Sequence, residues 1–382
     1  MENQRERILL IGMGELGGLV LELLARVPGI CEIIVADSNE ELAFRKSNSA
    51  IEGASLLGLF PKISHMKIDL LDIDNTALFL EKIKPFLIFN GTTLQSWWVI
   101  HQLPKEIVDR IYKIGCGLGP WSAMHLALTS KLMMAVQLSK LEPWVINSSF
   151  PDAVNASLGK QGMAPTIGIG NIDLVIPYIK KASSEILDVP INSIDVQLIA
   201  HHFHSFNWTR YGHSSDAPFY LRVFSDNEDV TEKLGDLNKF ITELPKRGRR
   251  SEGSQVQFLV ASSAVKNILA FLWDTQEYTH APGPMGLEGG YPVRLGRKGV
   301  ELVIPANISL DKAHLINVKA QQYDGISEIR SNGDIVISEE AYDILKNEIG
   351  VDIKIITIKD SYEQAMEFKR GLDGFIRKTQ TC

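Results

Sequence analysis

Three glycines with the spacing G-x-G-x-x-G are the first residues in this chain whose pattern indicates chemistry. Gly12, Gly14 and Gly17 directly follow the apolar run 8–11, and a segment with helical spacing comes next. This pattern predicts a buried strand, a tight turn and a helix whose N-terminus faces the turn. The unpaired N–H groups and positive dipole end of such a helix suit a pyrophosphate. Gly12 permits the turn, Gly14 lets a phosphate approach and Gly17 lets the helix pack closely, so we predict a dinucleotide site.

An acidic residue, Asp37, ends the next apolar run, 32–36, about 20 residues after the last of these glycines. A carboxylate at that position accepts hydrogen bonds from a ribose and repels a 2′-phosphate. Ser38 follows where a phosphate-binding arginine would stand, which favours NAD over NADP. Arg45 and Lys46 lie nearby and leave NADP open. Asp37 could also cap a helix, and the two roles are compatible.

Three further apolar runs, 65–70, 86–91 and 144–147, predict additional parallel strands. The carboxyl ends of such strands meet at one edge of the sheet, where a ligand crevice forms. The residues that we expect to bind the cofactor there, besides those named above, are Glu15, Leu16, Asp69, Leu70, Asn90, Gly91, Thr92 and Asn147.

A polar cluster follows the fifth predicted strand and contains Ser149, Asp152 and Asn155. Because it lies at a strand's carboxyl end, we expect these residues beside the nicotinamide or the substrate. Asp152 could instead cap a helix, and the sequence supports both readings equally. The pair Trp97-Trp98 predicts a packing or lid element.

The second half of the chain contains the cluster His201-His202-x-His204. We predict a strand over 196–204, which would place His202 and His204 on one face. A histidine is the best proton shuttle at neutral pH. No carboxylate or cysteine stands at a fitting spacing, so we predict no metal site. Ordinary hydrogen-bonded histidines are an equally good reading.

Residues 279–294 lack any periodicity and are rich in glycine and proline. We predict an active-site loop, with a structural loop as the alternative. Tyr291 lies within it, and the guanidinium of Arg294 could hold a substrate carboxylate. The basic segment Lys246–Arg250 could bind phosphate, but a solvated surface loop is the commoner case.

The order of these patterns predicts an α/β fold with two main domains. Residues 1–150 are expected to form a doubly wound parallel sheet, and 151–330 a second α+β domain with a mixed sheet. This second domain includes strands at 256–260 and 301–305 and a helix at 263–273. Residues 331–382 are expected to form a strand, a helix, a second strand and a second helix, and the sequence does not indicate which domain they pack on.

Composition limits the choice of partner. The chain has 382 residues, is 45% hydrophobic and carries a net charge of −7, which argues against nucleic acid and anionic membranes. No apolar run reaches the roughly 20 residues of a membrane span. The cysteines, Cys31, Cys116 and Cys382, are too scattered for a disulfide framework, which predicts a reducing cytoplasm.

With these residues the chain resembles the saccharopine dehydrogenase-like group of NAD(P)-dependent oxidoreductases. The resemblance rests on the three glycines with Asp37 and Asp69, on the two-domain plan and on Gly-Gly-Tyr-Pro-Val-Arg at 289–294. It implies a Rossmann domain for the cofactor and a mixed-sheet domain for substrate binding and dimerisation, hence a homodimer. It also implies chemistry at an imine or secondary-amine carbon next to a carboxylate.

We therefore expect hydride transfer between NAD and a small amino-acid-like substrate. Asp152 or His202 would handle the proton and Arg294 the carboxylate; the full set of expected reaction-site residues is Asp152, His202, His204, Tyr291 and Arg294. One alternative is a synthase that retains NAD as a prosthetic group, and another is a non-catalytic sensor or scaffold that binds the cofactor. A 2-hydroxy-acid dehydrogenase fits less well, because no His, Asp and Arg set stands in the order that such enzymes use.

Overall fold

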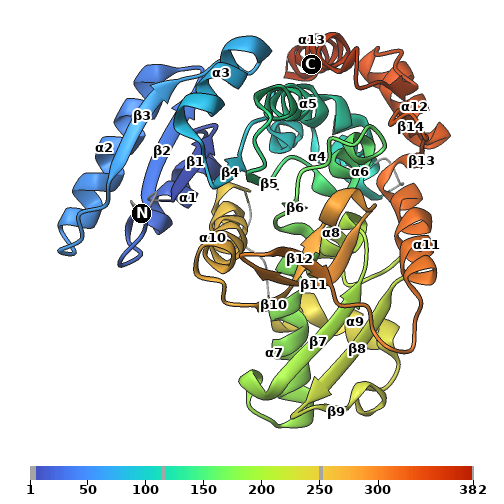
Figure 1. Ribbon diagram of the computed structural model, residues 1–382. Helices are drawn as coiled ribbons and strands as arrows, with labels where there is room; N and C mark the ends of the chain where they lie inside the picture. Colours follow the sequence, from blue (N-terminus) through green and yellow to red (C-terminus); the bar gives the residue numbers. More distant parts are fainter. Residues whose placement is uncertain (1–5, 114–116, 249–252, 381–382) are drawn as a thin grey trace.

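The computed structural model describes residues 6–113, 117–248 and 253–380, and Cys116, Cys382, Arg249 and Arg250 lie outside them (Figure 1). A six-stranded parallel sheet with the order β3-β2-β1-β4-β5-β6 forms the first half. Its strands are β1 (Arg7–Ile11), β2 (Glu32–Asp37), β3 (Ile63–Lys67), β4 (Leu87–Asn90), β5 (Trp144–Asn147) and β6 (Ile167–Gly168). The strand order reverses between β1 and β4, which is where doubly wound sheets bind ligands. The predicted α/β fold class is confirmed.

Helices cover both faces of this sheet. One face packs on α1 (Glu15–Ala25), α2 (Glu40–Ser55) and α10 (Gln257–Trp273). The other face packs on α3 (Ile73–Ile83), α4 (Lys105–Lys113), α5 (Ser122–Ser139) and α6 (Pro151–Gly159). Because the strands are buried on both sides, β1 and β4 are almost continuous apolar runs, as the sequence indicated.

Two antiparallel sheets and four helices form most of the second half. The strands are β7 (Ile194–Ile199), β8 (Tyr220–Ser225) and β9 (Glu228–Asp229) in one sheet, and β10 (Glu277–Pro282), β11 (Gly290–Gly296) and β12 (Gly299–Leu302) in the other. The helices are α7 (Ile176–Leu187), α8 (His202–Arg210), α9 (Leu237–Arg247) and α11 (Leu310–Ala320). An isolated backbone bridge between Ala200 and Gly290 and the hydrogen bond from the Tyr278 hydroxyl to the Val196 carbonyl join the two sheets.

From residue 331 onward the C-terminal segment has the predicted order of strand, helix, strand and helix, with one further strand before it, and it packs on the first half. It contains β13 (Ile326–Ile329), β14 (Ile335–Ile337), α12 (Glu339–Ile344), β15 (Ile355–Ile356) and α13 (Ser361–Gln380). Figure 1 shows α13 beside α5, and the ring of Phe368 meets Trp121 edge to face at 4.9 Å between centroids. The tail therefore shares the core on one face of the parallel sheet.

Short helices connect many of these elements. They are η1 (Trp97–Gln102), η2 (Gly119–Trp121), η3 (Asn171–Leu174), η4 (Ile191–Ser193), η5 (Thr231–Leu234), η6 (Gly253–Val256), η7 (Pro284–Gly286), η8 (Gln321–Asp324) and the π-helical η9 (Leu345–Ile349).

Three local predictions are wrong. The strand expected over 196–204 ends at Ile199, and a helix begins at His202. Residues 256–260 are helical instead of forming a strand: Val256 ends η6 and 257–260 open α10, since the apolar run continues with helical spacing to Trp273. The expected loop 279–294 is the β10–β11 hairpin. Its strands show no alternation of apolar and polar residues, because nearly every residue is buried.

The basic segment is partly helical. Lys246 and Arg247 occupy the last turn of α9, where they form ion pairs with Glu243 at 2.7 Å and Glu185 at 2.8 Å. Among the described residues, these two cations therefore belong to a solvated helix end, which is the commoner of the two readings.

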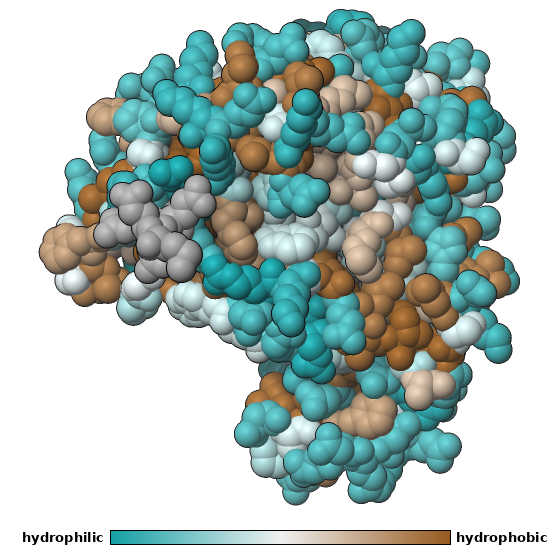
Figure 2. Space-filling model, in the orientation of Figure 1, coloured by the Kyte–Doolittle hydropathy of each residue, from teal (hydrophilic) through white to brown (hydrophobic). Residues whose placement is uncertain are grey.

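The surface is mixed in character. Figure 2 shows hydrophilic residues over most of the face in view, with apolar residues gathered near the start of α11. Leu310 and Leu315 of that helix are 43% and 48% exposed. None of the helices within the described ranges is long and apolar enough to cross a membrane.

The packing of the tail predicts a large effect of truncating Phe368. This side chain is 2% exposed, so Phe368→Ala should lower the free energy of unfolding by about 3–5 kcal/mol. Leu78→Ala, at a residue that is 61% exposed, should change it by less than about 0.5 kcal/mol. Urea denaturation of both variants gives the comparison. Equal effects would mean that the tail is not part of the core.

Candidate active site

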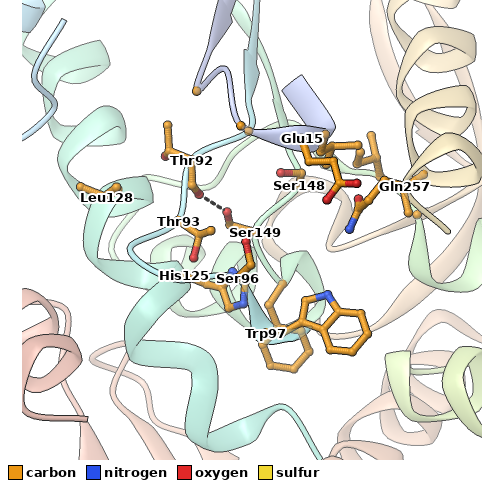
Figure 3. Close-up of a pocket in the computed structure, with 18 of the residues that line it drawn as sticks. Glu15, Thr92, Thr93, Ser96, Trp97, His125, Leu128, Ser148, Ser149 and Gln257 are labelled. Carbon is orange, nitrogen blue, oxygen red and sulfur yellow. Dashed lines mark hydrogen bonds between the residues drawn. The ribbon is translucent and has the colours of Figure 1, made fainter. Parts of the chain in front are cut away.

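A cavity of about 510 Å³ lies at the carboxyl-terminal edge of the parallel sheet, around the point where the strand order reverses. Its wall runs from the glycine turn to α8, and Figure 3 shows part of it. Of the residues expected to bind the cofactor, those that line it are Gly12, Gly14, Glu15, Leu16, Asp37, Ser38, Asp69, Leu70, Gly91 and Thr92.

The glycine turn has the geometry that its spacing indicated. Gly12 has a φ of +91°, and a Cβ at Gly17 would lie 1.9 Å from the Gly12 carbonyl oxygen. A Cβ at Gly14 would meet nothing within 4 Å, so the backbone there is open on the side of the missing side chain. No side chain caps α1 at Gly14. The first amides of that helix therefore have the character of an anion site.

Asp37 connects the end of β2 to this turn. Its Oδ2 accepts a hydrogen bond from the Met13 amide at 2.6 Å, and its Oδ1 accepts one from the Asn39 amide at 2.9 Å. Each carboxylate oxygen can accept a further bond, so the group can still take a ribose hydroxyl. Asp69 is arranged similarly at the end of the next strand, where it accepts from the Leu71 amide at 3.0 Å.

Asn90 and Asn147 do not line the cavity, because both are fully buried beneath it. The side-chain nitrogen Nδ2 of Asn90 donates to Asn147 Oδ1 at 3.0 Å. Asn90 Oδ1 accepts from the backbone amide and the hydroxyl of Thr92. Asn147 Oδ1 also accepts from the Ser149 amide at 3.0 Å. The two asparagines thus fix the loops that carry Thr92 and Ser149, whose hydrogen bond is drawn in Figure 3.

His202 reaches the cavity from the first turn of α8 and is paired with a buried carboxylate. Its Nδ1 lies 2.7 Å from Oδ2 of Asp324, which is 2% exposed. The other oxygen of Asp324 accepts from the Leu118 amide at 3.0 Å. Burial alone would raise the pKa of Asp324, but the charge and hydrogen bond of His202 outweigh it and hold that pKa below the usual value. Such a carboxylate orients the ring and stabilises its protonated form.

One face of α8 points into the cavity. His202, Ser205, Phe206 and Arg210 all line it, and their spacing places them on one side of a helix. The guanidinium carbon of Arg210 lies 4.1 Å from the centre of the Phe206 ring and 5.9 Å from that of Trp97. An imidazole paired with a carboxylate and a guanidinium therefore lie along the same wall. Trp97 and Trp98 also line this cavity, from η1.

The other expected reaction-site residues lie elsewhere. Asp152 is fully buried and accepts from the His202 amide at 2.9 Å and from the side chain of Asn171, so it holds the start of α8. His204 does not share a face with His202, because the segment is helical; its ring bonds to His201 and Ala217.

Tyr291 and Arg294 belong to the buried hairpin and do not line this cavity. Tyr291 is fully buried against Ile199 and Ala313. Arg294 donates to the Gln276 carbonyl at 3.0 Å and borders a separate cavity of about 870 Å³. The sequence suggested that Arg294 binds a substrate carboxylate. Its position in a separate cavity does not support that role at the sheet edge where the glycine turn lies.

Sequence reasoning missed Asp324, Arg210 and His125. Reading 202–210 as a helix would have revealed Arg210, since its spacing from His202 and Phe206 is helical. Asp324 lies 122 residues from His202, and nothing in its local sequence marks it. His125 is an isolated histidine in the apolar helix α5, and no motif around it indicates chemistry.

Comparisons with known proteins give the fold but no family. No protein-family model matches the chain, and no curated protein matches it significantly. Among solved structures, malate dehydrogenase from Cryptosporidium parvum is 16% identical with a TM-score of 0.56, over 84% of this chain and 98% of that one.

Two further solved structures are similar in the same way. Malate dehydrogenase from Plasmodium falciparum is 15% identical with a TM-score of 0.56, over 89% of this chain and 100% of that one. Lactate dehydrogenase from Eimeria maxima, with NADH and oxamate, is 12% identical with a TM-score of 0.55, over 84% and 93%. At these identities the likeness establishes the fold. The saccharopine dehydrogenase-like resemblance is not shown by these comparisons and stays a prediction.

The contact between Gly17 and the Gly12 carbonyl predicts opposite tolerances at two neighbouring glycines. Gly17→Ala should lower the free energy of unfolding by about 1–3 kcal/mol, because the added methyl group would collide with the Gly12 carbonyl oxygen. Gly14→Ala should cost under about 1 kcal/mol, since its methyl would meet no atom. Urea denaturation measures both. A Gly17→Ala variant as stable as Gly14→Ala would contradict the close packing of α1 on the turn.

Proposed function

We propose that the protein is an NAD-dependent dehydrogenase whose substrate carries a carboxylate next to the reacting carbon. One observation supports this above all others: a single cavity joins the glycine turn and Asp37 to the His202–Asp324 pair. The solved structures with this fold are malate and lactate dehydrogenases, which adds weight to an oxidoreductase.

The residues of the sheet edge fit a dinucleotide. The open backbone at Gly14 and the uncapped start of α1 suit the pyrophosphate, and Asp37 suits a ribose with a free 2′-hydroxyl. Asp37 therefore favours NAD over NADP. Bound there, the nicotinamide would supply the donor or acceptor of a hydride.

His202 is the best candidate for proton transfer. Because Asp324 engages Nδ1, the ring would exchange a proton with the substrate through Nε2. Asp152 supports this role by holding the backbone amide of His202, so it positions the ring without contacting the cavity. Arg210, two turns along α8, takes over the carboxylate-binding role expected of Arg294.

The arrangement favours reduction of a 2-oxo acid and oxidation of the 2-hydroxy acid, since Arg210 and His202, with the buried Asp324 behind it, face one cavity. The amino-acid-like imine expected from the resemblance makes the same demands on His202 and Arg210. The two substrate classes can be told apart by experiment, because an imine forms only when the oxo acid reacts with an amine.

A homodimer in the cytoplasm is part of the same proposal, and light scattering on the purified protein tests the dimer.

The cofactor assignment predicts that a carboxylate at the glycine turn abolishes binding. Gly14→Asp places a negative charge against the pyrophosphate and should weaken NAD at least about 100-fold, since like charges in an interface cost several kcal/mol. Gly374→Asp, in α13, adds the same charge at a position with no atom within 4 Å and should bind NAD normally. Isothermal titration calorimetry gives both affinities. Unchanged NAD binding by Gly14→Asp would refute the assignment.

The proton-transfer assignment predicts a rate defect without a binding defect. His202→Gln should lower kcat about 10²–10⁴-fold with unchanged NAD affinity, while His65→Gln, on β3, should leave kcat unchanged. The assay follows NADH oxidation with 2-oxo acids, with and without ammonium or a primary amine. A dependence on amine would identify the imine reaction.

Two results in this assay would favour the alternatives. Full activity of His202→Gln would remove this histidine from the reaction. Cofactor that copurifies with the protein and is not exchanged for added NADH would point to a synthase with resident NAD, and absence of any turnover would point to a sensor.

A further inference from the structure

His125 is a buried imidazole in the cavity wall that the fold itself does not use. It lies on α5 and is 6% exposed, and Figure 3 draws it beside Ser96 and Trp97, near Ser149. Neither of its ring nitrogens has a hydrogen-bond partner among the residues that the structure describes. Buried polar groups almost always have such a partner, so both nitrogens are suited to a molecule that enters the cavity.

His125 stands in a helix whose other buried residues are mostly apolar. The helix is buried on most sides, and its neighbours Met124 and Leu126 are core residues. Leu128, nearly one turn further on, lines the same cavity. The ring nitrogens make no hydrogen bond within the described residues, so the packing of α5 alone does not account for a polar side chain at this position.

His125 lies close to His202, with Phe150 packed against both. The centre of the Phe150 ring is 6.3 Å from that of His125 and 5.4 Å from that of His202. Phe150 has a φ of +41°, an unfavourable conformation for a residue with a side chain, and such strain is concentrated at functional sites. The backbone strain thus places an aromatic ring beside both imidazoles.

The two histidines differ in charge behaviour. Burial, and then the charge of His202, lower the pKa of His125 to about 3. No carboxylate is paired with His125 in the described part of the chain, whereas His202 has Asp324. His125 is therefore a neutral group at physiological pH, with one nitrogen that donates and one that accepts.

We propose that His125 recognises an uncharged polar group in the side chain of the substrate, separate from the carboxylate that Arg210 holds. This rests on the proposed function and narrows its substrate class to 2-oxo or 2-hydroxy acids with a neutral oxygen in the side chain. A neutral imidazole beside Trp97 and Phe150 gives no charge compensation to a second carboxylate. A purely aliphatic side chain would leave both ring nitrogens unpaired.

Two acids that differ only by an oxygen in place of a methylene group test the proposal. In 4-methoxy-2-oxobutanoate an ether oxygen replaces one methylene of 2-oxohexanoate. Their dissociation constants are measured by calorimetry on protein saturated with NAD⁺, where no turnover occurs. The wild type should bind the ether about three- to tenfold more tightly than the aliphatic acid, the range of one neutral hydrogen bond.

The variants separate recognition from folding. His125→Phe should bring the ratio of the two dissociation constants to about one, and His125→Gln, which keeps a donor, should restore part of the preference. Met133→Leu, on the same helix and outside the cavity wall, should keep the wild-type ratio. Because the ratio compares two ligands on one protein, a general loss of stability does not move it. If His125→Phe does not fold, His125→Gln against His125→Ala gives the same comparison.

Each other outcome has a definite meaning. An unchanged ratio in His125→Phe overturns the role of His125 and leaves the dehydrogenase proposal intact. A loss of NAD⁺ affinity in that variant assigns His125 to the cofactor and also overturns it. Binding of NAD⁺ but of neither acid rejects the substrate class and this inference together, and failure to bind NAD⁺ rejects the proposed function itself.

Discussion

The candidate site depends on one buried carboxylate that joins three distant segments of the chain. Asp324 accepts hydrogen bonds from His202, at the start of α8, and from the Leu118 amide, ahead of α5. It stands at the end of η8, where the C-terminal segment begins to pack on the parallel sheet. Burying a lone charge is costly, so the carboxylate requires both partners, and the three segments are fixed relative to one another.

Around this carboxylate the imidazoles differ in their partners and in their burial. His202 has an acidic partner and borders the cavity. His201 and His204 are buried, and burial lowers the pKa of each; the pKa of His204 falls to about 4. His125 is neutral for the same reason. Burial thus disfavours the charged form of the other three imidazoles, whereas Nδ1 of His202 lies 2.7 Å from Asp324 Oδ2 at the cavity wall.

The parts of the site that are local in sequence could be predicted, and those created by packing could not. The glycine turn and Asp37 follow from short-range rules, because each glycine has a steric reason at a fixed spacing. The strand expected over 196–204 failed because the apolar run passes from β7 into α8 without a glycine or proline to mark the break. Asp324 carries no local signal at all, since its role exists only once η8 packs against α8.

The C-terminal packing has a consequence for how the site comes into being during synthesis. The sheet strands and the glycine turn lie within the first 168 residues, but the carboxylate that orients His202 is made more than 150 residues later. The glycine turn and the His202–Asp324 pair are therefore completed at different times as the chain emerges. A chain that ends before residue 324 would contain the strands and the glycine turn without the carboxylate that pairs with His202, so on the proposed function its chemistry would begin only when the molecule is nearly finished.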